Sequence, residues 1–68
     1  MNPVSLIYVD RKKNAGVFAC ALIASETPFC YWHADVTGQH VFGFENLAHA
    51  AKAFALIQRV IPAEGWST

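Results

Sequence analysis

The feature that most constrains the fold is an aromatic segment at residues 29–36, Phe-Cys-Tyr-Trp-His-Ala-Asp-Val. Its aromatic residues show no helical spacing, and aromatic side chains favour strands. The dipeptide Thr37-Gly38 then marks a tight turn, and residues 39–44 form a second, shorter apolar run. The spacing therefore predicts a β-hairpin with strands over 29–36 and 39–44.

The rest of the chain predicts two further strands and one helix. Residues 4–9 are rich in β-branched and aromatic side chains, and residues 17–24 form an uninterrupted apolar run after a polar turn. From Leu47 the apolar residues recur at helical spacing, and Asn46 is a suitable N-cap. The order ββββα predicts an α+β fold, a four-stranded antiparallel meander with one C-terminal α-helix packed on one face, in a single small domain over residues 1–68.

A two-residue turn at Thr37-Gly38 would place Asp35 opposite His40 and would fix which side chains share a sheet face. The first face then carries Phe18, Cys20, Leu22, Phe29, Tyr31, His33, Asp35, His40, Phe42 and Phe44. The second face carries Cys30, Trp32, Ala34, Val36, Val41 and Gly43, together with Val17, Ala19, Ala21 and Ile23. The small residues of the second face favour it as the helix-covered face, which would leave the aromatic face open; the opposite assignment stays possible.

The predicted helix also has two sides. Its apolar face carries Leu47, Ala50, Ala51, Phe54, Ile57 and Ile61. Its polar side carries His49, Lys52 and Arg59, and Leu56 falls in the middle of that polar stripe. A single exposed leucine is ordinary, and the alternative is that this stripe is a second contact patch.

The chain is more apolar than a small soluble domain needs to be. Of its 68 residues, 54% are hydrophobic and 15% are charged, whereas charged residues make up about 25% of an average soluble domain. Small domains have proportionally more surface to cover with polar groups. We therefore expect a second chain, either a copy of this one or another protein, to cover part of the apolar surface.

Charge and cysteine content restrict the function further. Five basic and five acidic residues give no net charge, whereas a protein that binds duplex nucleic acid usually carries a basic excess. Two cysteines, Cys20 and Cys30, do not make a disulfide framework. Because the N-terminus lacks the features of a signal peptide and no apolar run is long enough for a membrane span, we expect a cytoplasmic protein with reduced thiols.

The residues capable of chemistry do not form a recognised catalytic or metal-binding motif. Cys30 and His33 have the spacing of zinc ligands, with Cys20 and His40 as further candidates, but residues three apart on a strand point to opposite faces. His33, Asp35 and His40 would share a face, but a meander with one helix predicts no cleft for general acid–base chemistry. We expect no enzyme activity, no cofactor and no metal.

The sequence thus predicts a non-enzymatic protein–protein interaction module, a regulator or inhibitor that acts as a homodimer by occluding a surface on a larger protein. The expected partner-binding residues are Tyr31, His33, His40, Phe42, Phe44, His49, Lys52, Leu56 and Arg59. The first alternative is single-stranded nucleic-acid binding, with bases stacked on the aromatic face and phosphates on Arg11, Lys12 and Lys13. The second alternative is a small Cys/His metal-binding protein.

In size and in its layout of strands followed by a helix, the chain resembles the small accessory proteins that bacteriophages use to block host machinery. That group includes anti-CRISPR proteins and polymerase inhibitors. The resemblance lies in size and layout and in no sequence motif. It implies the same mode of action, which is occlusion of a surface on a host protein.

Overall fold

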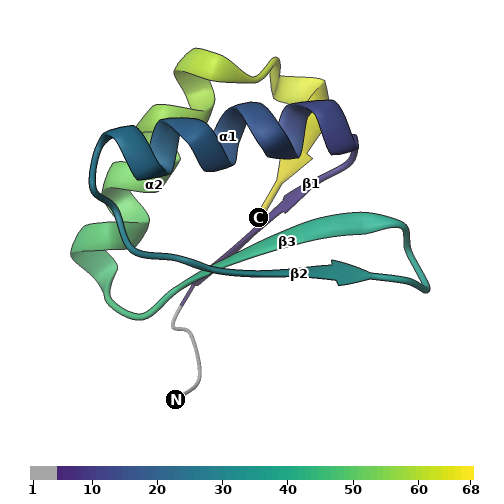
Figure 1. Cartoon of the computed structure of the whole chain (residues 1–68), viewed down its shortest axis with the longest axis horizontal. Coiled ribbons are helices and arrows are strands. Elements are labelled where there is room, and N and C mark those ends of the chain that lie inside the picture. The colour runs from purple at the N-terminus through teal and green to yellow at the C-terminus, as the bar shows by residue number, and fades with distance from the viewer. Residues whose placement is uncertain (1–4) are drawn as a thin grey trace.

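A computed structural model describes residues 5–68 and shows an α+β fold with two helices and a four-stranded antiparallel sheet (Figure 1). The elements in chain order are β1 (Ser5–Val9), α1 (Lys12–Ala24), β2 (Cys30–Ala34), β3 (Gln39–Phe44), α2 (Leu47–Val60), the 3₁₀ turn η1 (Ala63–Gly65) and β4 (Trp66–Ser67). The antiparallel sheet and the C-terminal helix confirm the coarse prediction. The meander and the single helix were wrong.

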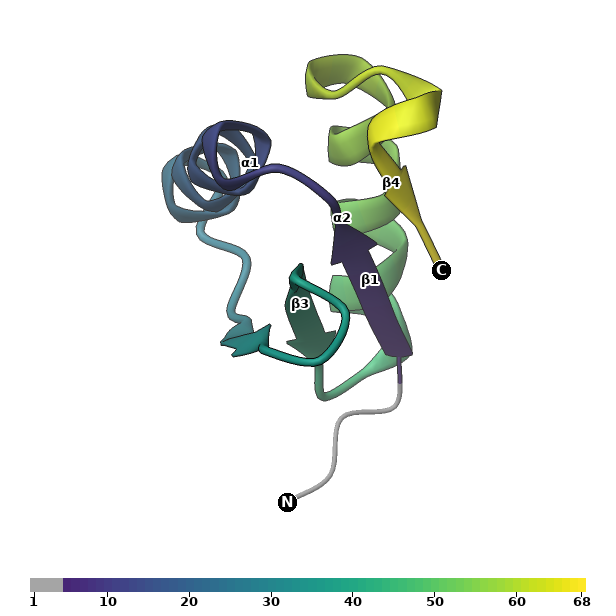
Figure 2. The same ribbon diagram turned by 90° about the vertical axis from the view of Figure 1, so that its right-hand side faces the viewer.

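The strands lie in the order β2-β3-β1-β4, so β1 sits between two strands that come later in the chain. Together with the βαββαβ element order, this is the split βαβ, or ferredoxin-like, arrangement. Each helix connects strands that are not neighbours, and β2 and β4 form the two edges of the sheet. Figure 2 shows α1 end-on and α2 from the side, so the two helices cross as they cover the sheet.

The segment predicted as a strand over residues 17–24 is the second half of α1. Its buried residues are Ala15, Phe18 and Leu22, which recur at helical spacing, while Val17 and Ile23 are exposed. A short, continuous apolar run does not separate a buried strand from a helix by periodicity alone. The polar residues before it, expected to form a turn, are the first turn of the same helix.

Both helices cover the first sheet face, which carries the aromatic side chains, and the second face has no helix. Core residues come from the inward positions of β1 and β3 and from both helices: Ile7, Val9, Phe42, Phe44, Ala15, Phe18, Leu22, Ala50, Ala53 and Ile57. The rings of Phe18 and Phe42 meet edge to face with centroids 4.9 Å apart. The preference for a helix on the small-residue face was therefore wrong, and the opposite assignment, which the sequence left open, is the observed one.

The β2–β3 hairpin has a four-residue loop in place of the expected two-residue turn. Ala34 pairs with Gln39 and His33 pairs with His40, so the predicted pairing of Asp35 with His40 was wrong. The register differs from the predicted one by two residues. Because side chains alternate with a period of two, such a shift leaves the residues of β2 and β3 on their predicted faces.

Helix α2 begins where it was predicted, but its buried side is rotated. The Asn46 side chain accepts a hydrogen bond from the His49 backbone N–H at 2.8 Å, which confirms the N-cap. Ala50, Ala53 and Ile57 are buried, whereas Leu47 is exposed. Phe54 contacts Trp66 in the C-terminal segment, which the sequence did not predict as a strand.

Candidate interaction surface

The sheet face without helices is formed by the outward side chains of the strands, and we call it the outer sheet face. One cross-strand row consists of Trp32, Val41 and Tyr8, because Val41 pairs with Trp32 on one side and with Tyr8 on the other. The next row consists of Cys30, Gly43 and Leu6. Ala34 and Gln39 form the row beside the hairpin loop. None of the outward residues in these three rows is charged, and the nearest charge in the described structure is at the border of the face, where the Asp10 carboxylate accepts a hydrogen bond from the Gln39 side-chain amide at 3.0 Å.

The centre of this face is buried although no helix covers it. Val41 is 2% exposed, whereas its neighbour Trp32 is 42% exposed. Trp32 and Tyr8 flank Val41 on the two adjacent strands. Two partly exposed aromatic residues around a buried aliphatic one have the composition that protein interfaces favour at their centre.

The edge strand β2 borders this face and lacks the usual protection against pairing. It forms hydrogen bonds to β3 on one side only, and in the described sheet its other side is free. Its five residues, Cys30–Ala34, include no proline and no lysine, two of the features that commonly prevent edge-to-edge association. Four of the five are exposed, so the edge and the outer sheet face form one continuous accessible surface.

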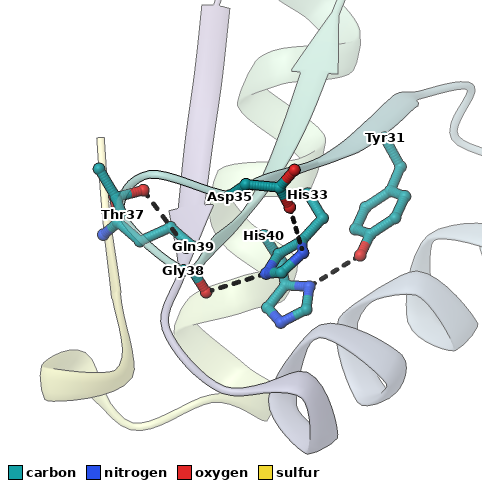
Figure 3. A network of polar contacts seen from close by, with 7 residues as sticks. All are labelled: Tyr31, His33, Asp35, Thr37, Gly38, Gln39 and His40. Carbon is teal, nitrogen blue, oxygen red and sulfur yellow. Dashed lines mark hydrogen bonds and ion pairs between the residues drawn. The ribbon is translucent and has the colours of Figure 1, made fainter.

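Part of the predicted site forms a polar cluster at the β2–β3 hairpin, on the opposite sheet face (Figure 3). The Tyr31 hydroxyl and His40 Nδ1 share a hydrogen bond of 2.7 Å, and the rings of His33 and His40 stack with centroids 4.6 Å apart. His33 Nδ1 lies 3.4 Å from Asp35, whose side chain is 95% exposed. Tyr31, His33 and His40 are therefore brought together as predicted, but Asp35 contacts His33 and not His40.

The electrostatic environment of His40 is opposite to the predicted one. Its side chain is buried, and burial is the main factor that lowers its pKa below the ordinary histidine value. The neighbouring His33 and Lys12 lower the pKa further. The expected carboxylate partner would have favoured the charged form of this imidazole, whereas the folded protein favours the neutral form.

Phe42 and Phe44, predicted as partner-binding residues on an open aromatic face, belong to the core. Both are fully buried. They lie on the sheet face that the two helices cover, so they offer no accessible surface. Their prediction depended on leaving that face open, which the position of α1 excludes.

The predicted residues on α2 do not form a patch with the hairpin cluster. His49 lies in the first turn and interacts with Asn46, and Arg59 lies in the last turn. The Lys52 ammonium donates a hydrogen bond to the Ser25 carbonyl oxygen at 2.7 Å and so connects α2 to the C-terminal end of α1. Leu56, expected within an exposed polar stripe, is partly buried and packs against the core.

The basic residues of the nucleic-acid alternative lie at the start of α1. Arg11 is its N-cap residue, and Lys12 and Lys13 form its first turn, which has no acidic residue. Cations at this end of a helix are unfavourable because the helix dipole is positive there. These side chains belong to the helix layer, on the same side of the sheet as the exposed Tyr31, whereas Trp32 lies on the outer sheet face.

The cysteine and histidine residues do not make a metal centre. Cys30 and His33 lie on opposite faces of β2, as the strand periodicity predicted. Across residues 5–68, no group of three or more His, Cys, Asp or Glu side chains is placed to hold a metal ion. Cys20, expected inside a strand, is exposed on α1, and both cysteines are free thiols.

The sequence identified Trp32 but assigned it to the covered face, and it missed Leu6 and Tyr8. The signal that could have identified them is the alternation along β1, where Ile7 and Val9 point to the core and Leu6 and Tyr8 point away.

Among the described residues, no helix has both the length and the apolar character needed to cross a membrane. No known family model, curated protein or solved structure matches this chain.

Proposed function

We propose that this chain is a non-enzymatic protein-interaction module, a small regulator or inhibitor that binds another protein through the outer sheet face and occludes part of its surface. The observation that supports the proposal is the uncovered, uncharged face around Trp32, Val41 and Tyr8, which continues onto the unprotected edge of β2. In the absence of that partner, a second copy of the chain occupies the same face.

The chemistry of the face favours protein over nucleic acid as the partner. Nucleic-acid binding draws much of its free energy from contacts between basic side chains and phosphates. The outward positions Leu6, Tyr8, Trp32 and Val41 carry no charge, and Lys12 and Lys13 lie in the helix layer. Trp32 and Tyr8 keep single-stranded nucleic acid as the second candidate, because exposed aromatic rings on a sheet can stack bases. The topology itself supports neither function, because one fold hosts many.

The test is the association state of the wild-type protein and of a Trp32→Lys variant, measured by sedimentation equilibrium at micromolar concentration. We expect the wild-type protein to be a dimer and the variant to be a monomer, since a lysine at the centre of the contact would lose its hydration there. Val17→Lys is the matched control, because Val17 is exposed to a similar extent but lies on α1. It should remain a dimer.

Two results would contradict the proposal. One is a wild-type protein that remains monomeric at high concentration, and the other is a dimer that Val17→Lys dissociates and Trp32→Lys does not. A single-stranded oligonucleotide titrated into the same samples separates the two candidates. Salt-sensitive binding that Trp32→Lys abolishes would favour the nucleic-acid function.

A further inference from the structure

A cleft of about 330 Å³ lies on the helix-covered side of the molecule, between α1 and the β2–β3 hairpin, and we call it the α1–β2 cleft. It is lined by Lys12, Ala15, Gly16 and Ala19 of α1 and by Phe29, Tyr31, His40 and Phe42 of the sheet side. Its volume is at the lower end of the range for small-molecule sites.

The cleft exists because α1 presents only short side chains toward the edge strand. Ala15, Gly16 and Ala19 leave β2 without a covering layer, and the inward-facing Tyr31 is consequently 49% exposed. Phe42 forms the aromatic base of the cleft, with its ring centroid 5.3 Å from that of Tyr31 and 5.6 Å from that of Phe29. The body of the cleft is therefore apolar and aromatic.

Gly16 is the most informative residue of this lining. It lies inside α1, where glycine is destabilising relative to alanine. A Cβ atom added at this position would meet no other atom within 4 Å, and the residue does not have a positive φ. Neither close packing nor backbone conformation thus requires glycine here. The consequence of having no side chain at this position is that the cleft stays open.

The ionisable residues that line the cleft include a cation and no anion. They are Lys12 and the hydrogen-bonded pair of Tyr31 and His40, and none of the eight lining residues is acidic. Figure 3 shows the Tyr31 hydroxyl directed at the His40 ring beside α1. The first turn of α1 adds its own positive potential, because it contains Lys12 and Lys13 and no carboxylate.

We propose that the α1–β2 cleft binds a small aromatic carboxylate, with the ring system packed against Phe29 and Tyr31 and the carboxylate paired with the Lys12 ammonium. The ring of such a ligand fits the aromatic lining of the cleft, and its carboxylate carries the charge opposite to that of Lys12. The cleft and the outer sheet face are on opposite sides of the sheet, so this binding is independent of the proposed protein interaction.

The probe is 2-naphthoate, with the uncharged 2-naphthamide as its matched control, titrated into the full chain and followed by two-dimensional amide NMR and calorimetry. We expect naphthoate to shift the signals of the cleft residues and to bind about tenfold more tightly than the amide, the size of effect that one partly exposed charge pair can produce. No detectable naphthoate binding at millimolar concentration would overturn the proposal.

Two substitutions localise the site. Gly16→Met places a side chain in the cleft and should abolish binding of both compounds, and the unchanged far-UV circular dichroism spectrum of the variant will show that it is folded. Lys12→Met should remove the preference for the carboxylate but retain weak binding of the amide. Lys13→Met is the control, because Lys13 lies in the same helical turn but does not line the cleft.

The opposite pattern would overturn the proposal. Naphthoate binding that survives Gly16→Met, or a preference for the carboxylate that is lost in Lys13→Met and kept in Lys12→Met, would place the ligand elsewhere. The Trp32→Lys variant should bind naphthoate as the wild-type protein does. A result that contradicts the proposed cleft ligand can therefore be distinguished from one that contradicts the proposed interaction surface.

Discussion

At the scale of single residues, His40 shows how tertiary contacts reverse an expected effect. Opposite a carboxylate, its charged form would have been favoured. In the fold it is buried against Tyr31, stacks on His33 and lies near Lys12, and none of these neighbours is acidic. Burial and the two basic neighbours lower its pKa, so protonation of His40 opposes folding.

The pH dependence of stability follows from the direction of that shift. A histidine with a lowered pKa in the folded state stabilises the fold fully above its unfolded pKa of about 6.5. This contribution is lost as the pH falls below that value toward the lowered pKa. We expect the urea midpoint of the wild-type protein to decrease between pH 7.5 and pH 5.5, a window set around that unfolded value.

The variant that checks this expectation is His40→Gln, which cannot titrate and can still form a hydrogen bond to Tyr31. Its midpoint should depend less on pH than that of the wild-type protein. His49→Gln is the control, since His49 lies at the start of α2, and it should retain the wild-type dependence. An equal pH dependence in His40→Gln and in the wild-type protein would show that another group is responsible.

At the scale of elements, the two glycines Gly16 and Gly65 report on how tightly their elements are packed. Gly65 ends the η1 turn, and its carbonyl oxygen accepts a hydrogen bond from the Asp10 backbone N–H at 3.1 Å. A Cβ atom added there would lie 3.0 Å from Asn14 Nδ2 and 3.0 Å from Ile61 Cγ2. The C-terminal segment thus approaches α1 closely, whereas the Gly16 face of α1 is open.

The same substitution should therefore have opposite effects at the two positions. Gly16→Ala should stabilise the fold by about 0.5–1 kcal/mol, because alanine favours the helix and meets no obstacle. Gly65→Ala should destabilise it by roughly 1–2 kcal/mol, because neighbouring atoms must move to accommodate the methyl group. Urea unfolding of both variants measures the free-energy changes, and changes of the same sign would contradict this view of the packing.

Some of the helices and strands could be predicted from the sequence, and others could not. The hairpin strands, the first strand and α2 could be predicted because β-branched or aromatic runs, or helical spacing with a cap, mark each of them. The apolar run of α1 and the two-residue strand β4 could not be predicted, because neither has a periodicity that separates helix from strand. Only packing against Phe42 and the β1 edge decides their conformation.

At the scale of the whole molecule, two helices cover one face of the sheet. The other face, which carries Trp32, Val41 and Tyr8, has no helix. Binding of any second chain to the folded state increases the apparent stability with concentration. If a second copy occupies the outer sheet face, the midpoint of thermal unfolding should rise as the wild-type protein is concentrated. The midpoint of Trp32→Lys should not change with concentration.

Differential scanning fluorimetry over a hundredfold range of protein concentration measures this dependence, with Val17→Lys as the control that should behave like the wild-type protein. A midpoint that is independent of concentration in the wild-type protein would contradict self-association. A dependence that persists in Trp32→Lys would place the contact on the helix layer.

The alternation of side chains along β1, β2 and β3, and hence which of their residues share a face, can be predicted from the sequence alone. That pattern survived a two-residue error in register, because alternation has a period of two. The apolar composition, 54% of the residues, is the sequence feature that motivates the proposed partner.

Which sheet face is open depends on how the helices pack on the sheet. The choice depends on α1, a helix whose apolar run the sequence alone did not separate from a strand, and on its crossing from β1 to the far edge of the sheet. Once α1 covers Phe42 and Phe44, the aromatic residues left on the outer sheet face are Trp32 and Tyr8, and the short side chains of α1 leave a cleft beside the exposed Tyr31. Both candidate surfaces thus follow from long-range packing, which local sequence patterns do not encode.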